Sequence, residues 1–178
     1  LLANGEVTIH NIPRLQDIYT FNNVLRVLGA RVSFREENNT LVIDPSHVSY
    51  LEAPYDLVRK MRASFYMLGA LVGIHGFAKV SLPGGCAWGP RPVDLHLKGM
   101  EAMGVEIELE KGYVIAKATK TLTGKSFTLN PSSVGATVNL LLAAVLRAEE
   151  FTIHNAAKEP DVVLLCEFLT QMGANIAG

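Results

Sequence analysis

The chain has 178 residues, of which 49% are hydrophobic and 19% charged, with a formal net charge of −1. A chain of this length buries roughly 70% of the surface that its unfolded form exposes, which allows one sizeable core or two small ones. Because basic residues are not in excess, the composition argues against a nucleic-acid-binding surface.

One sequence pattern recurs along the chain. The sequence Val-Thr-Ile-His-Asn at residues 7–11 returns as Phe-Thr-Ile-His-Asn at residues 151–155, and the same offset relates Gly29 to Gly173. A third copy lies between them and begins at Val80. We therefore expect three supersecondary units that start near residues 7, 80 and 151 and pack into one domain.

In the first unit, a short strand at residues 7–9 precedes an amphipathic helix, which Gly29 is expected to end in a left-handed conformation. The apolar face of this helix should be buried and is formed by Ile18, Phe21, Val24, Leu25 and Leu28. In the corresponding helix of the third unit, Leu165 and Leu169 should be buried as well. Alternating polarity at residues 32–34 then predicts a half-buried strand, and residues 41–43 its hairpin partner. The middle unit repeats this order, with a turn at Lys111-Gly112.

Two further segments are apolar on nearly all sides. They run from Tyr55 to about Ile74 and from Ser133 to about Leu146, with charge only near their ends. Helices of this kind lie at the centre of a fold. The predicted fold class is therefore α+β, with repeated βαββα-type units, buried central helices and outer sheets.

The middle unit differs from the other two in a longer loop at residues 83–93, which contains glycines, prolines, Cys86 and Arg91. Cys86 lies between two glycines and a downstream arginine, so its thiol should be partly exposed beside a cation, a setting that lowers the pKa of a thiol and favours reactivity. The alternative is an incidental small loop residue. Arg91 stands between two prolines, and a rigid arginine suits bidentate binding of phosphate or carboxylate, although a solvated loop arginine is the alternative.

Two predicted helix starts offer further anion contacts. Arg62 lies against an apolar run near the front of its helix, where anions are favoured. Small and hydroxyl residues at 131–137 leave backbone N–H groups open to an anion, with plain N-capping by Ser132 or Ser133 as the alternative. No metal is expected, because the spacing of Cys86, Asp94 and His96 matches no common zinc pattern.

The remaining expectations concern the setting of the chain. Two cysteines make no disulfide framework, Cys166 is expected as a buried small residue, and a reducing, cytoplasmic compartment follows. The uncharged runs at 63–78 and 127–146 are interrupted by Gly, His, Pro, Ser or Asn, so neither is expected to span a membrane, and no signal peptide is visible. The chain begins at Leu1 without an initiator Met and is expected to belong to a longer protein.

Residues 82–96 resemble the loop signature of the UDP-N-acetylglucosamine enolpyruvyl transferases, in the EPSP synthase superfamily. The resemblance continues through residues 53–58, 61–64, 133–137 and 155–160. It implies a fold of two domains, each built from three α+β repeats with buried helices. Residues 1–178 would then form most of the first domain, with the second domain absent.

The resemblance also implies the reaction. The 3′-hydroxyl of UDP-N-acetylglucosamine adds to C2 of phosphoenolpyruvate while C3 is protonated, and phosphate then leaves. Cys86 matches the family's loop cysteine, a general acid that can form an adduct with phosphoenolpyruvate. Residues matched to substrate binding are Arg62, Arg91, Pro92, Val93, Asp94, Leu95, Pro131, Ser132, Ser133 and Val134. No cofactor is implied, the oligomeric state stays open, and the chain alone is expected to be inactive because the general base lies outside it.

Two departures from the family pattern are visible: Trp88 replaces a smaller aliphatic residue, and Pro131 stands where some members have Lys. The first alternative function is that of a 3-phosphoshikimate 1-carboxyvinyltransferase, which shares the repeats but not the cysteine loop. A non-catalytic ligand-binding paralogue is the second, and retention of Cys86, Arg62 and Arg91 weighs against it. A purely structural repeat module leaves the long middle loop unexplained.

Overall fold

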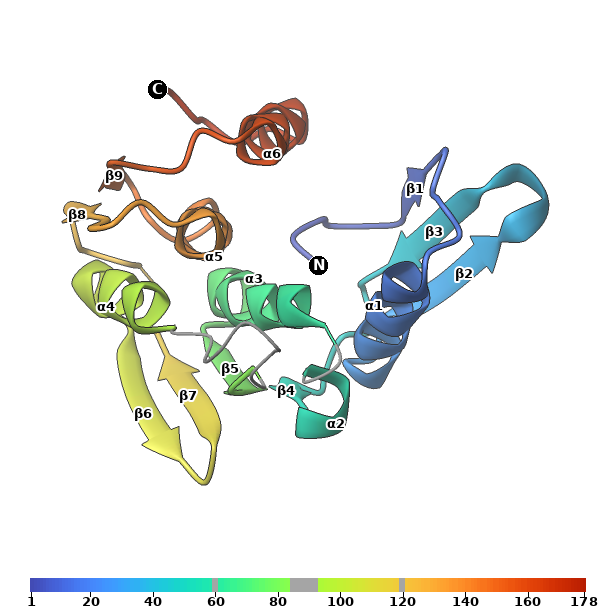
Figure 1. Ribbon diagram of the computed structural model, residues 1–178, viewed down its shortest axis with the longest axis horizontal. Helices are drawn as coiled ribbons and strands as arrows, with labels where there is room; N and C mark the ends of the chain where they lie inside the picture. Colours follow the sequence, from blue (N-terminus) through green and yellow to red (C-terminus); the bar gives the residue numbers. More distant parts are fainter. Residues whose placement is uncertain (59–60, 84–92, 119–120) are drawn as a thin grey trace.

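The computed structural model of the chain describes residues 1–58, 61–83, 93–118 and 121–178, without the side chain of Arg62 (Figure 1). The elements, in chain order, are β1 (Val7–Ile9), α1 (Gln16–Val27), β2 (Arg31–Arg35), η1 (Glu36–Asn38), β3 (Thr40–Asp44), β4 (Glu52–Ala53), α2 (Tyr55–Val58), η2 (Arg62–Tyr66), α3 (Met67–His75), β5 (Phe77–Ser81), α4 (Asp94–Met103), β6 (Glu106–Glu110), β7 (Tyr113–Lys117), β8 (Ser126–Thr128), α5 (Val134–Ala144), β9 (Thr152–His154) and α6 (Pro160–Gln171).

The three amphipathic helices α1, α4 and α6 end in the same way. Each is followed by a left-handed glycine, Gly29, Gly104 or Gly173, with φ of 104°, 96° and 102°. In each case the next residue donates its N–H to a carbonyl five positions earlier at 3.0 Å, from Ala30 to Leu25, from Val105 to Met100 and from Ala174 to Leu169. Glycine takes this conformation without the Cβ clash that other residues meet, which is why the pattern recurs at these positions.

The strands form three sheets, in the orders β1-β3-β2, β4-β5-β7-β6 and β8-β9. The hairpins β2–β3 and β6–β7 are antiparallel, as the turn residues predicted. Two short strands, β4 and β8, were not predicted, and each pairs in parallel with the first strand of the following unit, β5 or β9. Unlike β1, which the repeated sequence pattern marked, β4 and β8 had only their own two or three residues to identify them, too few to show alternation.

Helices α3 and α5 lie at the centre, with the sheets and the amphipathic helices around them (Figure 1). Seven consecutive residues of α3, from Met67 to Gly73, are buried. A Cβ added at Gly69 would overlap the backbone oxygen of Asn139, and one at Gly73 that of Leu142. The two helices therefore touch backbone to backbone and run in the same direction. These observations confirm the predicted α+β class with buried central helices and outer sheets.

The prediction of one helix from Tyr55 to Ile74 is wrong. The segment divides into α2, η2 and α3, and Met61 between them is extended, with φ −147° and ψ 121°. Val58 and Met61 are both buried, whereas three charged residues lie at Arg59, Lys60 and Arg62. A central helix that continued through all of these positions would have to place charged residues among buried apolar ones, which is unfavourable.

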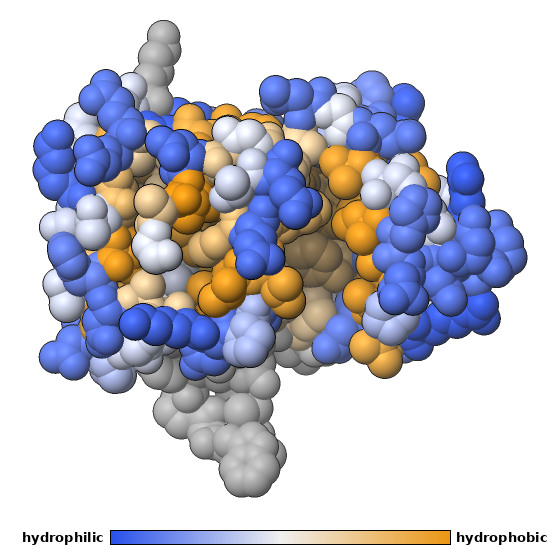
Figure 2. Space-filling model, turned by 90° about the horizontal axis from the view of Figure 1, so that it is seen from above, coloured by the Kyte–Doolittle hydropathy of each residue, from blue (hydrophilic) through white to orange (hydrophobic). Residues whose placement is uncertain are grey.

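Burial follows the predicted faces with three exceptions. Val24, Leu25, Leu28 and Leu169 are buried, but Ile18, Phe21 and Leu165 are only partly buried. Leu165 lines an apolar groove of ≈ 440 Å³, whose walls come from the first residues of the chain, β1, α1, β3, α3, α5 and α6. Figure 2 shows apolar residues around this hollow, seen from above Figure 1.

Candidate functional site

The start of α4 follows directly on the long loop of the middle unit. The hydrogen-bond ladder of the helix begins where Leu97 N–H donates to Val93 O at 3.1 Å, so N–H groups of the preceding turn have no acceptor within the helix. The side chains of Val93 and Leu95 pack against the hydrophobic core. A ligand at this position would therefore meet backbone groups of these two residues rather than their side chains.

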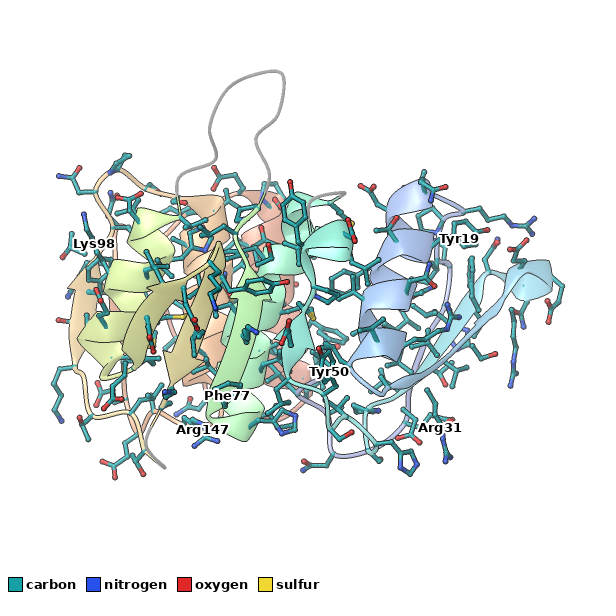
Figure 3. All side chains as sticks on the ribbon, turned by 90° about the horizontal axis from the view of Figure 1, so that it is seen from below. Tyr19, Arg31, Tyr50, Phe77, Lys98 and Arg147 are labelled. Carbon is teal, nitrogen blue, oxygen red and sulfur yellow. The ribbon has the colours of Figure 1, made fainter. Side chains whose placement is uncertain are left out.

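Asp94 is the first residue of α4 and is exposed. Its carboxylate lies 3.6 Å from the ammonium of Lys98 one turn later, and both side chains are more than half exposed. Lys98 projects outward from α4 in Figure 3. An exposed pair of this kind contributes little to stability, which leaves the carboxylate available for another partner.

The start of α5 is capped by Ser133. Its hydroxyl accepts the N–H of Ala136 at 3.3 Å, so the N-capping interpretation of this serine is confirmed. Thr137 continues the cap, because its hydroxyl donates to Ser133 O at 2.8 Å and accepts the N–H of Ala157 at 3.0 Å. Pro131 and Ser132 are exposed, and Val134 is partly buried.

The segment after β9 is held against this helix start. Asn155 is left-handed, with φ 54°, and its side-chain amide donates to Leu129 O at 2.8 Å. Together with the bond from Ala157 to Thr137, this contact fixes residues 155–157 beside the start of α5. The sequence resemblance included both segments, and the structure brings them together.

The other predicted residues are placed only in part. Arg62 begins η2 rather than lying inside a long helix, and its side chain is outside what the structure describes. Cys86, Arg91 and Pro92 lie outside the described residues.

One buried residue that the sequence analysis missed connects the elements of the site. Asn139, in the middle of α5, is 0% exposed. Its Oδ1 accepts the N–H of Gly69 at 2.7 Å, and its Nδ2 donates to Phe65 O at 3.2 Å and to His96 Nδ1 at 2.9 Å. The sequence does contain a signal for it, which is an amide side chain inside an otherwise apolar helix. A buried amide requires hydrogen-bond partners, so such a residue indicates a contact with another part of the chain.

These contacts orient the helices of the site. Gly69 faces Asn139 and Gly73 faces Leu142, so α3 and α5 run the same way. On the other side of α5, His96 contacts Asn139 and a Cβ at Gly99 would meet Leu140 Cδ1 at 2.5 Å. The first turn of α4, the segment η2 and the first turn of α3 thus meet the middle of α5 at one residue. Helix starts attract anions through their free N–H groups and the helix dipole.

Other features of the described residues do not join this site. No three His, Cys, Asp or Glu side chains are grouped there as metal ligands would be. Cys166 is only partly buried on α6, and this burial raises the pKa of its thiol. None of the described candidate substrate residues lines the apolar groove. Across the described ranges, no helix has the length and apolar character needed to cross a membrane.

A comparison with protein families matches residues 1–178, the whole chain, to the family described as EPSP synthase (3-phosphoshikimate 1-carboxyvinyltransferase). The chain belongs to this family. The fold and the arrangement of its central helices are thereby those of an enolpyruvyl transferase, as the sequence resemblance indicated.

Curated relatives refine the comparison. The chain is 54% identical over 179 residues to the UDP-N-acetylglucosamine 1-carboxyvinyltransferase of Chloroherpeton thalassium, covering 100% of this chain and 41% of that protein. It is 49% identical over 178 residues to the enzyme of the same name from Hydrogenovibrio crunogenus, covering 100% of this chain and 42% of that protein. The chain thus spans about two fifths of the length of these relatives.

Solved structures agree on the fold. The enolpyruvyl transferase NikO from Streptomyces tendae matches with a TM-score of 0.84 and 26% identity, over 99% of this chain and 41% of that one. An EPSP synthase from Acinetobacter baumannii matches with a TM-score of 0.70 and 17% identity, over 99% and 40% of the two chains. At that identity the second match supports the fold alone.

Proposed function

We propose that the protein containing this chain transfers the enolpyruvyl group of phosphoenolpyruvate to the 3′-hydroxyl of UDP-N-acetylglucosamine and releases phosphate. The observation on which this rests is the 54% identity over the whole chain to an enzyme named for that activity. In the cell, this reaction is the first committed step of peptidoglycan synthesis, so we place the protein in the cytoplasm and in cell-wall formation.

The substrate contacts are proposed at two helix starts. Backbone N–H groups before Leu97 and the exposed carboxylate of Asp94 are available at the start of α4. At the start of α5, Pro131 and Ser132 are exposed, while Ser133 is occupied in part as a cap. The UDP-sugar would lie along residues 91–95 and 131–134, with Arg62 and Arg91 neutralising phosphate charge.

Cys86 is proposed as the general acid. It would deliver a proton to C3 of phosphoenolpyruvate as the sugar oxygen bonds to C2. In the following step phosphate would leave C2 while C3 loses a proton, which restores the carbon–carbon double bond. The base that takes the sugar proton is proposed to lie outside residues 1–178. Four named groups then have separate tasks: the thiol transfers a proton, the two arginines bind phosphate, and Asp94 orients the sugar.

We also propose that residues 1–178 make up most of one enolpyruvyl transferase domain. The first two units each contain an amphipathic helix, a hairpin and a buried helix, whereas the third contains β9 and α6. The apolar groove beside α6, with Phe168 and Met172 exposed at its edge, is where a further hairpin and helix of the third unit would pack. The second domain is proposed to lie in the rest of the protein.

The alternative activity on 3-phosphoshikimate has less support. The family takes its description from that enzyme, but the EPSP synthase structure is 17% identical to this chain, against 54% for the curated UDP-N-acetylglucosamine enzyme. A substrate competition distinguishes the two. Phosphate release by the full-length protein should require UDP-N-acetylglucosamine and should not occur with shikimate 3-phosphate.

The test is a phosphate-release assay with Cys86→Ser, Arg91→Ala and Arg62→Ala beside the wild type. Each arginine variant should lose about tenfold to a hundredfold in the ligand-dependent step, the equivalent of one charge-assisted hydrogen bond. Arg31→Ala is the matched control, because it removes an exposed arginine of β2 that belongs to neither helix start. Full activity in the Cys86 and Arg91 variants, with folding intact, would refute the assigned roles.

A further inference from the structure

The orientation of the Asn139 side chain is determined by two backbone groups. The N–H of Gly69 can only donate, so the atom that faces it at 2.7 Å must be the amide oxygen. The carbonyl of Phe65 can only accept, so the atom that faces it at 3.2 Å must be the amide nitrogen. Rotating the amide by 180° would exchange its oxygen and nitrogen and break both of these hydrogen bonds.

This orientation sets the protonation of His96. The amide nitrogen of Asn139 also lies 2.9 Å from Nδ1 of His96, and because this nitrogen is a donor, Nδ1 must be the acceptor. The ring proton is therefore on Nε2 and the imidazole is neutral. The ring is 4% exposed, and the Phe65 ring packs against it edge to face, with centroids 5.3 Å apart. A proton added at Nδ1 would point at the amide N–H.

The pair joins the three segments of the proposed site. Phe65 lies one turn after Arg62 in η2, His96 lies two residues after Asp94 in α4, and Asn139 lies in α5 downstream of Ser133. Each is buried, so their bonds are not exchanged for bonds to water. A buried hydrogen-bonded amide at such a junction fixes the spacing of the helices more narrowly than apolar packing does.

We infer that Asn139 and His96 are positioning residues, which hold the starts of α4 and α5 at the separation that the UDP-sugar requires, through a neutral His96 protonated on Nε2. This inference deepens the proposed function and rests on it for the identity of the sugar ligand. Neither residue is assigned a contact with substrate. The expected signature is a change in affinity for the UDP-sugar with little change in the chemical step.

Two substitutions at one position isolate the hydrogen bond. His96→Asn retains an acceptor oxygen near the position of Nδ1, whereas His96→Leu has a similar bulk and no polar atom. Both remove the ring that contacts Phe65, so the difference between them reports on the bond to Asn139. In the full-length protein, His96→Leu should raise KM for UDP-N-acetylglucosamine about fivefold to tenfold, with kcat within about twofold. His96→Asn should restore KM to within about twofold of the wild type.

Calorimetric titration with UDP-N-acetylglucosamine should give the same ranking without turnover. If KM and Kd agree in all three proteins and only Tm falls, the pair is structural and the inference is overturned. The tautomer is tested separately by ¹⁵N spectra of the histidine-labelled protein at pH 7, where a protonated Nδ1 of His96 would contradict the geometry. If the wild type binds no UDP-sugar, the proposed function and the positioning role both fail, while the tautomer assignment stands.

Discussion

Gly29 and Gly173 have nearly the same left-handed backbone, with φ of 104° and 102°, but different surroundings. A Cβ at Gly29 would stand 2.6 Å from the carbonyl oxygen of His47, whereas a Cβ at Gly173 would meet nothing within 4 Å. The two positions thus separate the cost of a left-handed conformation from the cost of a steric clash.

Gly173→Ala should lower the free energy of unfolding by about 1–2 kcal/mol, the cost of a left-handed L-residue. Gly29→Ala should lower it by a further ~1–3 kcal/mol, because the neighbouring atom belongs to backbone and cannot rotate away. Chemical denaturation of the two variants and the wild type measures both terms. Equal losses at the two glycines would show that the contact with His47 is not formed.

Ser64 offers a substitution that should stabilise the protein. The side chain is 0% exposed, and its hydroxyl has no hydrogen-bond partner among the described residues. A buried unpaired hydroxyl costs roughly 1–3 kcal/mol, so Ser64→Ala should leave the free energy of unfolding unchanged or raise it by about 1 kcal/mol.

Thr137→Val is the control for this prediction. Its hydroxyl is also buried but makes two hydrogen bonds, to Ser133 O and from Ala157 N–H. Its loss should therefore destabilise the protein by about 1–3 kcal/mol, measured by the same denaturation. A loss of stability in Ser64→Ala would mean that the hydroxyl has a partner in the folded protein.

The helices and hairpins with a regular sequence pattern could be predicted. For the site, the sequence indicated which segments take part but not how they contact one another. Gly29 and Lys111-Gly112 were recognised because a local backbone conformation requires particular residues there. The break at Met61 was not, because it depends on the tertiary packing that buries Val58 and Met61. Asn139 illustrates the same limit, since the sequence shows an amide in an apolar helix, and its partner His96 is far away in the chain.

Ser133 is proposed to serve both as a cap and as part of the substrate site. Ser133→Ala should lower the free energy of unfolding by about 0.5–2 kcal/mol, because Ala136 N–H loses its acceptor. Ser133→Gly should lower it by only about a few tenths of a kcal/mol. Ser132→Ala, at an exposed neighbour, is the stability control. Should Ser133→Gly keep its stability and still raise KM for the UDP-sugar, the hydroxyl contacts substrate as well.

Cys166 should react slowly with alkylating agents in the folded protein. Burial raises the pKa of its thiol above the ordinary value of 9.0, so at neutral pH less of it is thiolate, the reactive form. Its labelling rate should increase as pH rises towards that pKa, and unfolding in urea should accelerate it. Mass-spectrometric mapping should find Cys86 modified first and should show a rate that UDP-N-acetylglucosamine changes. Faster labelling of Cys166 than of Cys86 would reverse this assignment.

The parallel pairs β4–β5 and β8–β9 link each unit to the next. Ala53 pairs with Val80 and Phe127 with Ile153, so the last strand of one unit completes the sheet of its successor. A cut between units would thus leave an unpaired sheet edge on both pieces, unlike a cut between the stacked repeats of a solenoid. The three units should accordingly melt in one transition, with the same midpoint for a probe near Tyr19 and one near Phe168. A repeated sequence is thus expected to give a body that unfolds as a whole.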